Sequence, residues 1–228
     1  MNTDAGMYLW IGLMSAVVFI SIYGIKILNP TYTDWLLAGG DLSQHYLGWE
    51  AYRASEWHFP LGMVDTLAYP NLTSIIFTDS IPLFALFFKI VSPILPLKFQ
   101  YFGLWGILCF ILQGLCAGRI LNRYSSSRIS TILLSVMFTI TPTVIQRMFG
   151  HTALAGQWIL LFGLDMVFNS EKYEEKKNVY ITVAAMGVLS ASVHIYYILM
   201  SGIILVGYIV NELLSHKNWK KCLTVLAI

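Results

Sequence analysis

Six long runs of apolar residues occupy most of this 228-residue chain and constrain its fold more than any other feature. A helix that crosses a bilayer needs about 20 mostly apolar residues. Only 11% of the residues are charged, whereas a soluble domain carries about 25%. The sequence therefore predicts an all-α polytopic membrane protein. The predicted spans are residues 7–28, 99–121, 129–148, 152–168, 179–194 and 195–214.

The spacing of the runs predicts a single transmembrane domain over residues 1–228. The last two runs are nearly continuous, and together they are far too long for one span. We therefore expect a break at 194–197, with two antiparallel helices joined by a tight turn. Another apolar run starts at Cys222 and stops after one or two turns, so we expect the chain to be the N-terminal part of a longer protein.

The basic residues predict an orientation. Nine of the 14 basic residues lie in three short loops, which the positive-inside rule assigns to the cytoplasm. In one topology the N-terminus is cytoplasmic and 29–98 is a long outer loop. In the other the N-terminus is outside and 79–96 crosses the bilayer. The loop residues are Arg119, Arg123, Arg128, Lys172, Lys176, Lys177, Lys217, Lys220 and Lys221.

Segment 79–96 distinguishes the two topologies. It is apolar, but it contains three prolines and Lys89, which makes it marginal as a span. The absence of Lys and Arg before the first span favours an outside N-terminus, whereas the acidic content of the long loop favours a cytoplasmic one. We expect a cytoplasmic N-terminus, with 79–96 lying along or dipping into the outer interface.

The long loop concentrates polar and aromatic residues. Residues 29–78 contain five acids, two histidines and three tryptophans. Loops carry the specific polar residues of a scaffold, and tryptophan and tyrosine gather at membrane interfaces. We therefore expect this loop to lie on the membrane surface and to carry short interfacial helices.

Residues 39–49 are the most informative part of this loop. A glycine pair allows a tight turn, after which Asp41 is expected at the N-cap of a helix running to about Ala54. At a spacing of four, Asp41 and His45 share one helix face. Such a pair can hold a divalent cation or activate a hydroxyl. The alternative is that Asp41 only caps the helix and His45 packs at the interface.

Three further candidates are expected on the same outer face. Arg147 lies at the outer end of the third span, where it can bind any lipid headgroup or hold one specific phosphate. His151 opens the next helix, and His194 lies at the outer turn between the last two spans. Their convergence on one side favours a functional site.

Other charged residues have simpler interpretations. Lys89 is expected to extend to the headgroups or to face a phosphate. Asp79 is expected to cap the apolar helix that follows it. Asp165, near the inner end of the fourth span, is a functional candidate as an intramembrane carboxylate, although it can also reach the cytoplasmic headgroups.

Charge and cysteine content exclude other classes of protein. The net charge of +2 gives no signature of nucleic-acid binding. Cys109, Cys116 and Cys222 all lie in apolar stretches, with neither a disulfide pattern nor the spacing of metal ligands.

Several segments resemble the GT-C class of integral-membrane glycosyltransferases. A first span is followed by a long loop with an early acid, in Gly-Asp-Leu-Ser-Gln-His-Tyr-Leu-Gly-Trp at 40–49. Together with 57–62, 69–70, 78–82 and 149–158, this stretch is most similar to an uncharacterised bacterial family of that type. The resemblance covers nearly the whole chain, but only the N-terminal half of a typical member.

The resemblance implies a GT-C-like helix bundle in a bacterial inner membrane, with a cytoplasmic N-terminus and 29–98 outside. It implies transfer of a hexosyl or pentosyl group from a polyprenyl-phosphate-linked donor to an acceptor on the outer face. Asp41 matches the first-loop acid, which in the class holds a metal, such as Mg or Mn, or activates the acceptor. The residues expected to bind substrate or phosphate are His45, Lys89, Arg147, His151 and His194.

One departure from the class leaves the metal open. Where the oligosaccharyltransferase subunit has an arginine and then an acidic pair, this chain has Arg147 followed by His151 and no acid. A metal-independent mechanism is therefore an alternative.

Two other functions remain as alternatives to an enzyme. A transporter or flippase of a lipid-linked or small polar substrate would favour broken midplane helices and internal repeats, neither of which is clear in the sequence. A non-catalytic assembly subunit would leave Asp41 dispensable.

Overall fold

The computed structural model of the protein describes residues 3–168, 176–215 and 219–227. The described chain is mostly helical, as predicted, and three of its helices are long and apolar enough to cross a membrane. About twenty residues at 1.5 Å per residue match the hydrocarbon thickness of a bilayer, about 30 Å. These helices are α1 (Thr3–Tyr23), α4 (Phe102–Leu121) and α9 (Ile195–Ser215).

The third and fourth predicted spans are interrupted helices, which differs from the continuous runs expected at 129–148 and 152–168. In the third, Pro142 begins a new helix because its ring removes a backbone donor. In the fourth, the chain is irregular at Gly156 and Gln157. The pieces are α5 (Arg128–Met137), η4 (Phe138–Ile140), α6 (Pro142–Arg147), η5 (Thr152–Ala155) and α7 (Trp158–Phe168).

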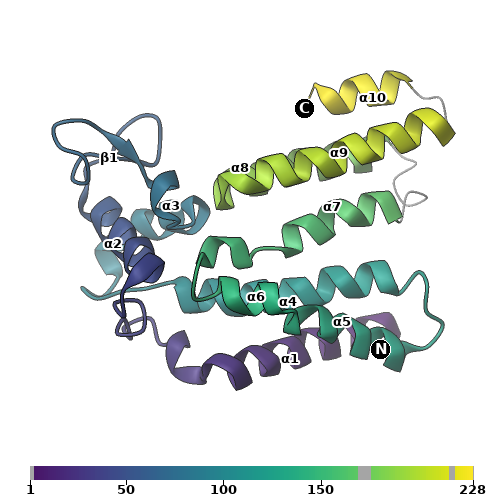
Figure 1. Ribbon diagram of the computed structural model, residues 1–228, viewed down its shortest axis with the longest axis horizontal. Coiled ribbons are helices and arrows are strands. Elements are labelled where there is room, and N and C mark those ends of the chain that lie inside the picture. The colour runs from purple at the N-terminus through teal and green to yellow at the C-terminus, as the bar shows by residue number, and fades with distance from the viewer. Residues whose placement is uncertain (1–2, 169–175, 216–218, 228) are drawn as a thin grey trace.

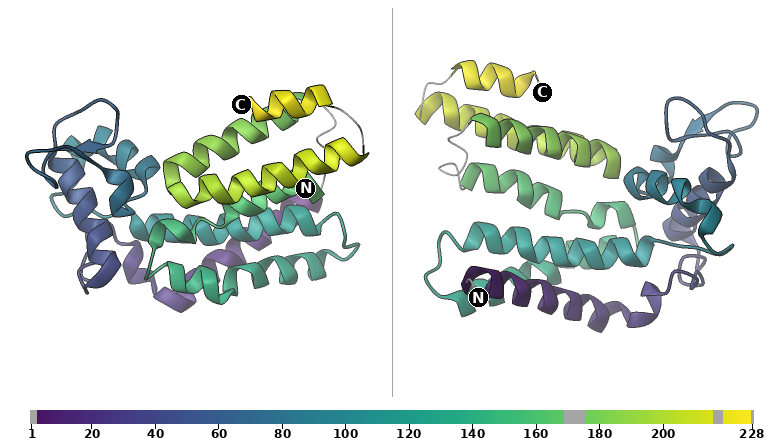
Figure 2. Two further views of the ribbon diagram at one scale, coloured as in Figure 1. Left: turned by 45° about the horizontal axis from the view of Figure 1, so that its top comes forward. Right: turned by 180° about the vertical axis from the view of Figure 1, so that it is seen from behind.

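The break expected at 194–197 is confirmed. Helix α8 (Lys176–Val193) ends immediately before His194, and α9 begins immediately after it. The two helices form the antiparallel pair visible in Figure 2. A short helix, α10 (Trp219–Leu226), then packs back along α9 (Figure 1).

The helices lie side by side in one bundle with α4 in its interior (Figure 1). Helix α4 packs against α1 and α5 on one side and α7 on the other, and α9 packs on α7. Glycines permit the close approach of α1 to α4. A Cβ at Gly114 would lie 2.3 Å from Ser15 Oγ, and one at Gly118 would lie 2.7 Å from Ile11 Cδ1.

Residues 24–101, here called the head segment, fold over one end of the bundle (Figures 1 and 2). Helix α3 has nine residues, about 14 Å of helix, which is too short to cross a bilayer. The chain before and after α3 stays at the same end. The elements are η1 (Ile25–Leu28), α2 (Gly40–Ala54), β1 (Met63–Val64) paired with β2 (Thr73–Ser74), η2 (Ile75–Thr78), α3 (Pro82–Ile90) and η3 (Ser92–Ile94).

The N-terminus and the connection from α4 to α5 lie at the opposite end of the bundle (Figure 1). Arg119, Arg123 and Arg128 belong to this connection and its flanking helix ends, as the predicted separation of basic loops from the long loop requires. Lys172 and Lys217 lie outside the described residues. The assignment of this end to the cytoplasm stays a prediction.

Candidate functional site

Three histidines from separate parts of the chain surround the carboxylate of Asp79. His194 Nε2 lies 2.7 Å from Oδ1, and His151 Nδ1 lies 3.0 Å from Oδ2. His45 Nε2 is 3.5 Å from the same Oδ2. These four residues, here called the His–Asp cluster, lie where the head segment meets the bundle.

The position of Asp79 differs from the expected helix cap. Asp79 does not cap α3, whose N-cap is Ile81 and has no side-chain hydrogen bond. Asp79 instead adopts a left-handed conformation, with φ 52° and ψ 23°, and turns its carboxylate toward the histidines. Asp79 lies in segment 78–82, one of those that resemble the GT-C class, and this was the signal in the sequence for a functional role. Thr78-Asp79-Ser80 is, however, equally typical of a helix cap.

Helix α2 and the chain around Asp79 approach closely because residue 48 is glycine. A Cβ on Gly48 would lie 2.4 Å from Thr78 Oγ1 and 2.7 Å from Ser80 Oγ. Ser80 Oγ donates to the carbonyl of His45 at 2.7 Å, and the Tyr101 hydroxyl donates to the carbonyl of Ser80. The backbone that carries Asp79 is therefore held from two sides.

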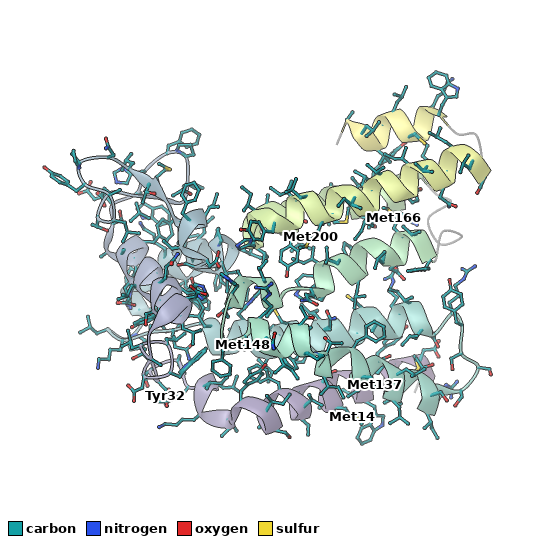
Figure 3. All side chains as sticks on the ribbon, viewed as in Figure 1. Met14, Tyr32, Met137, Met148, Met166 and Met200 are labelled. Carbon is teal, nitrogen blue, oxygen red and sulfur yellow. The ribbon has the colours of Figure 1, made fainter. Side chains whose placement is uncertain are left out.

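Packing also seats the segment that carries His151. Met148 is fully buried, and a Cβ on Gly106 of α4 would lie 2.4 Å from its Cε. Figure 3 shows Met148 in the part of the bundle that lies nearest the head segment. Thr152, on the other side of His151, accepts the indole N–H of Trp105 at its carbonyl, at 2.8 Å. His151 is thus fixed to α4 through both neighbours.

The histidines keep Asp79 ionised. Its side chain is only 14% exposed, and burial alone raises the pKa of a carboxyl group. The hydrogen bond from His194 and the imidazoles of His45 and His151 beside the carboxylate act in the opposite direction and prevail, so the pKa of Asp79 lies well below its usual range. The cluster therefore contains a mostly buried anion at neutral pH.

Asp41 lies next to the cluster and not at the helix cap. The N-cap of α2 is Gly39, and Asp41 is the second helical residue, so the expected N-cap position is wrong. Its Oδ2 lies 3.6 Å from His151 Nε2, and its side chain is 50% exposed. The predicted shared face is confirmed, since Asp41 and His45 both approach His151.

Arg147 lines a cavity of about 220 Å³ together with Thr143, Gln157 and Tyr197. Its side chain is half-buried. Among the residues that the structure describes, its guanidinium has no hydrogen-bond or ion-pair partner. Arg147 precedes His151 by four residues, and Tyr197 follows His194 by three, so two residues that line the cavity are close in sequence to residues of the cluster.

Two charged residues that were expected to reach lipid headgroups, Lys89 and Asp165, have partners within the protein. Lys89 is 6% exposed and donates to the carbonyls of Ser55 and Glu56 at 2.8 and 3.1 Å. Lys89 therefore joins α3 to the end of α2 and does not extend to the headgroups, whereas its expected phosphate contact stays a prediction. Asp165 is 1% exposed and pairs with Arg119 Nε at 2.5 Å, rather than reaching toward headgroups.

These features define a helical protein with three helices fit to cross a membrane and a cluster of histidines and an aspartate at one end of the bundle. The chain belongs to the DUF6311 family, described as a domain of unknown function, whose family model matches residues 12–228. The match contains the whole cluster, Asp41 and Arg147. No curated protein and no solved structure matches the chain.

Proposed function

We propose that the protein is a GT-C-type glycosyltransferase that moves a hexosyl or pentosyl group from a polyprenyl-phosphate-linked donor to an acceptor on the outer face of a bacterial inner membrane. The observation that carries this proposal is a half-exposed carboxylate, Asp41, beside a polar cluster at the end of an apolar bundle, together with a cavity-lining guanidinium, Arg147, that has no partner among the described residues. The partners are this lipid-linked donor and membrane lipid.

The phosphate of the donor is assigned to the Arg147 cavity. A polyprenyl chain partitions into the bilayer, which brings its phosphate to headgroup depth. A guanidinium can bind two phosphate oxygens at once, and a fixed cation stabilises the charge that develops on a leaving group. Arg147 meets these requirements because no described carboxylate already neutralises it.

Asp41 is assigned as the general base. It is the more exposed of the two carboxylates, at 50% against 14% for Asp79, so an acceptor can reach it. In the proposed step Asp41 takes the proton of the acceptor hydroxyl, whose oxygen forms a bond to the anomeric carbon. The bond from that carbon to the phosphate oxygen breaks, and the phosphate leaves with the electron pair beside Arg147.

His151 is assigned as a positioning residue. Its ring lies between two carboxylates, with Nδ1 3.0 Å from Asp79 and Nε2 3.6 Å from Asp41. It connects the buried anion to the exposed one and thereby limits where the Asp41 carboxylate can point. His45 and His194 support it by holding Asp79.

Asp41→Asn tests the proposal in a sugar-transfer assay with proteoliposomes, because it removes the negative charge and changes little else. Loss of a general base lowers the rate by roughly 10²–10⁴. Asp34→Asn is the matched control, since Asp34 is exposed in the same segment and has no place in the cluster. Equal transfer by Asp41→Asn and the control would overturn the assignment.

The interrupted helices favour a second candidate, a transporter or flippase of the same class of lipid. Transporters place substrates at discontinuous helices, and the Arg147 cavity lies between α6 and α7, which belong to the interrupted spans. A flippase moves labelled lipid between the leaflets of a liposome and leaves the sugar–phosphate bond intact. The proposed enzyme breaks that bond.

A further inference from the structure

We propose that His45, Asp79 and His151 form a binding site for a divalent transition-metal ion of the Zn²⁺ type. Thr152, His194 and Asp41 contact these ligands on the atoms that face away from the metal. The site rests on the geometry of the cluster and stands whether or not the proposed reaction is right. One ligand atom from each of the three residues lies within 4.8 Å of the other two.

The spacing of the ligand atoms suits a metal ion. Zinc binds nitrogen and carboxylate oxygen at about 2.0–2.2 Å, so two ligands at a tetrahedral angle lie about 3.4 Å apart. His45 Nε2 and His151 Nδ1 lie 3.5 and 3.0 Å from Asp79 Oδ2. The third distance, between the ligand nitrogens of His45 and His151, is at most 4.8 Å. It shortens by rotation of the His151 ring, which is 43% exposed.

The proton on His45 is placed by Thr152. The Thr152 hydroxyl donates to the carbonyl of Met148 at 3.1 Å, so it accepts from His45 Nδ1, 3.2 Å away. With the proton on Nδ1, Nε2 carries the lone pair that a metal needs. This lone pair faces an oxygen of the Asp79 carboxylate inside the protein, an unfavourable contact that a cation between the two atoms makes favourable.

His194 likewise occupies the oxygen of Asp79 that does not face the metal. Its Nδ1 accepts the backbone N–H of Tyr196 at 3.1 Å, so its proton lies on Nε2 and is donated to Asp79 Oδ1. Oδ1 is thereby occupied, whereas Oδ2 faces His45 and His151. His194 uses both ring nitrogens and is not itself a ligand.

Asp41 completes the outer set of partners. Its Oδ2 lies 3.6 Å from His151 Nε2, so a proton on Nε2 can point to Asp41 and leave Nδ1 for the metal. Metal-bound histidines generally donate their second N–H to a carboxylate, a carbonyl or water. All three proposed ligands therefore have a partner on the atom that does not face the metal.

The ligand types select the class of ion. Imidazole suits zinc, iron, copper and nickel, whereas magnesium prefers oxygen ligands and keeps several waters. Two imidazoles and one carboxylate therefore favour a transition metal over Mg²⁺. Three protein ligands also leave a coordination position open, as in catalytic zinc sites, and the half-exposed His151 marks the side from which a ligand can enter.

Titration of the full chain with Zn²⁺ alone tests the site. The protein, purified in detergent and stripped with a chelator, is dialysed against Zn²⁺, and bound metal is measured by mass spectrometry. We expect one tightly bound Zn²⁺ per chain, with no displacement by equimolar Mg²⁺. His151→Ala removes a half-exposed ligand and is expected to abolish tight binding. Asp41→Asn, which changes only an outer partner, is expected to weaken binding by roughly 10–100-fold.

His58→Ala is the matched control, because His58 pairs with Asp65 on the surface of the same segment at 3.1 Å. It is expected to bind Zn²⁺ as the unchanged protein does. Absence of stoichiometric Zn²⁺ from the unchanged protein, or equal affinity in His151→Ala, would overturn the proposal. The readout is metal content, so this failure is separate from a failure of the sugar-transfer assay.

Discussion

Asp79 and His194 are 115 residues apart in the chain, and Nε2 of His194 donates to Oδ1 of Asp79 at 2.7 Å. This bond joins the end of η2 to the break between α8 and α9. The break that separates the two helices is therefore also the point at which the second half of the bundle contacts the head segment. We infer that the His–Asp cluster forms only when the α8–α9 pair is packed in place.

Asp79→Asn is expected to destabilise the fold. Asparagine tolerates the left-handed backbone but loses the negative charge that accepts the hydrogen bond from His194 Nε2. Hydrogen bonds to charged groups contribute about 1.5–3 kcal/mol each, so we expect a loss of about 2 kcal/mol or more in the free energy of unfolding in micelles. Asp34→Asn, at an exposed residue of the same segment, is expected to stay within about 0.5 kcal/mol. Similar values for the two variants would contradict the structural role of the cluster.

The contribution of Asp79 to stability is expected to persist in mild acid. Its pKa in the folded protein is lower than in the unfolded chain, where a typical value is about 3.9. The contribution is therefore fully present above about pH 4 and is lost only as the pH falls further, toward the folded pKa. The measurement is the difference in unfolding free energy between the protein and Asp79→Asn from pH 6 to 3. Disappearance of that difference already at pH 6 would refute the low pKa.

Gly48→Ala is expected to displace Asp79 from His45. The new Cβ would lie 2.4 Å from Thr78, and this clash must separate α2 from the chain around Asp79. Overpacking of this kind costs about 1–3 kcal/mol, measurable by unfolding. Gly207→Ala is the control, because a Cβ there meets nothing within 4 Å. If both variants were equally stable, close approach at Gly48 would not be what positions the cluster.

Much of the helical architecture was predictable from apolar runs and charge. The break at His194 followed from the length of an apolar stretch that no single span accommodates. The interruptions at Pro142 and Gly156 were not predicted, because both lie inside runs whose overall hydropathy is continuous. Hydropathy indicates whether a segment lies in lipid or in water. It does not indicate where the helix is interrupted, because these breaks depend on local backbone chemistry.

The candidate site was predicted in part. Asp41, His45, Arg147, His151 and His194 were identified because polar residues are rare in an apolar chain. Asp79 was assigned as a cap because its short-range pattern fits one, and only contacts with residues distant in the sequence reveal its role. The partners of Lys89 could not be predicted, because they are backbone carbonyls, which leave no signal in the sequence.

Arg147→Gln is expected to weaken the use of the lipid donor. The change removes the positive charge in the cavity but keeps a polar side chain of similar length. We expect KM for the polyprenyl-phosphate donor to rise by at least tenfold, since a charge-assisted contact contributes about 1.5–3 kcal/mol. Lys98→Gln removes an exposed cation of the head segment and is expected to leave KM unchanged. An unaltered KM in Arg147→Gln would contradict the assignment of the donor phosphate to this cavity.

The head segment is expected to face outside. Ala68 is exposed in the head segment and Ser126 is exposed in the α4–α5 connection at the opposite end. In intact cells, an impermeant thiol reagent is expected to label Ala68→Cys and to leave Ser126→Cys unlabelled until the membrane is opened. The reverse pattern would invert the topology and place the cluster on the cytoplasmic face.

Cleavage of the donor in detergent micelles tests the proposed activity most directly, because no transport between leaflets is possible there. The protein is incubated with polyprenyl-phosphate hexoses and pentoses and an acceptor extract, and free polyprenyl phosphate is quantified by mass spectrometry. We predict release of polyprenyl phosphate by the unchanged protein and loss of at least 100-fold of that rate in Asp41→Asn. Donor that binds the protein but remains intact would contradict a glycosyltransferase and favour a flippase.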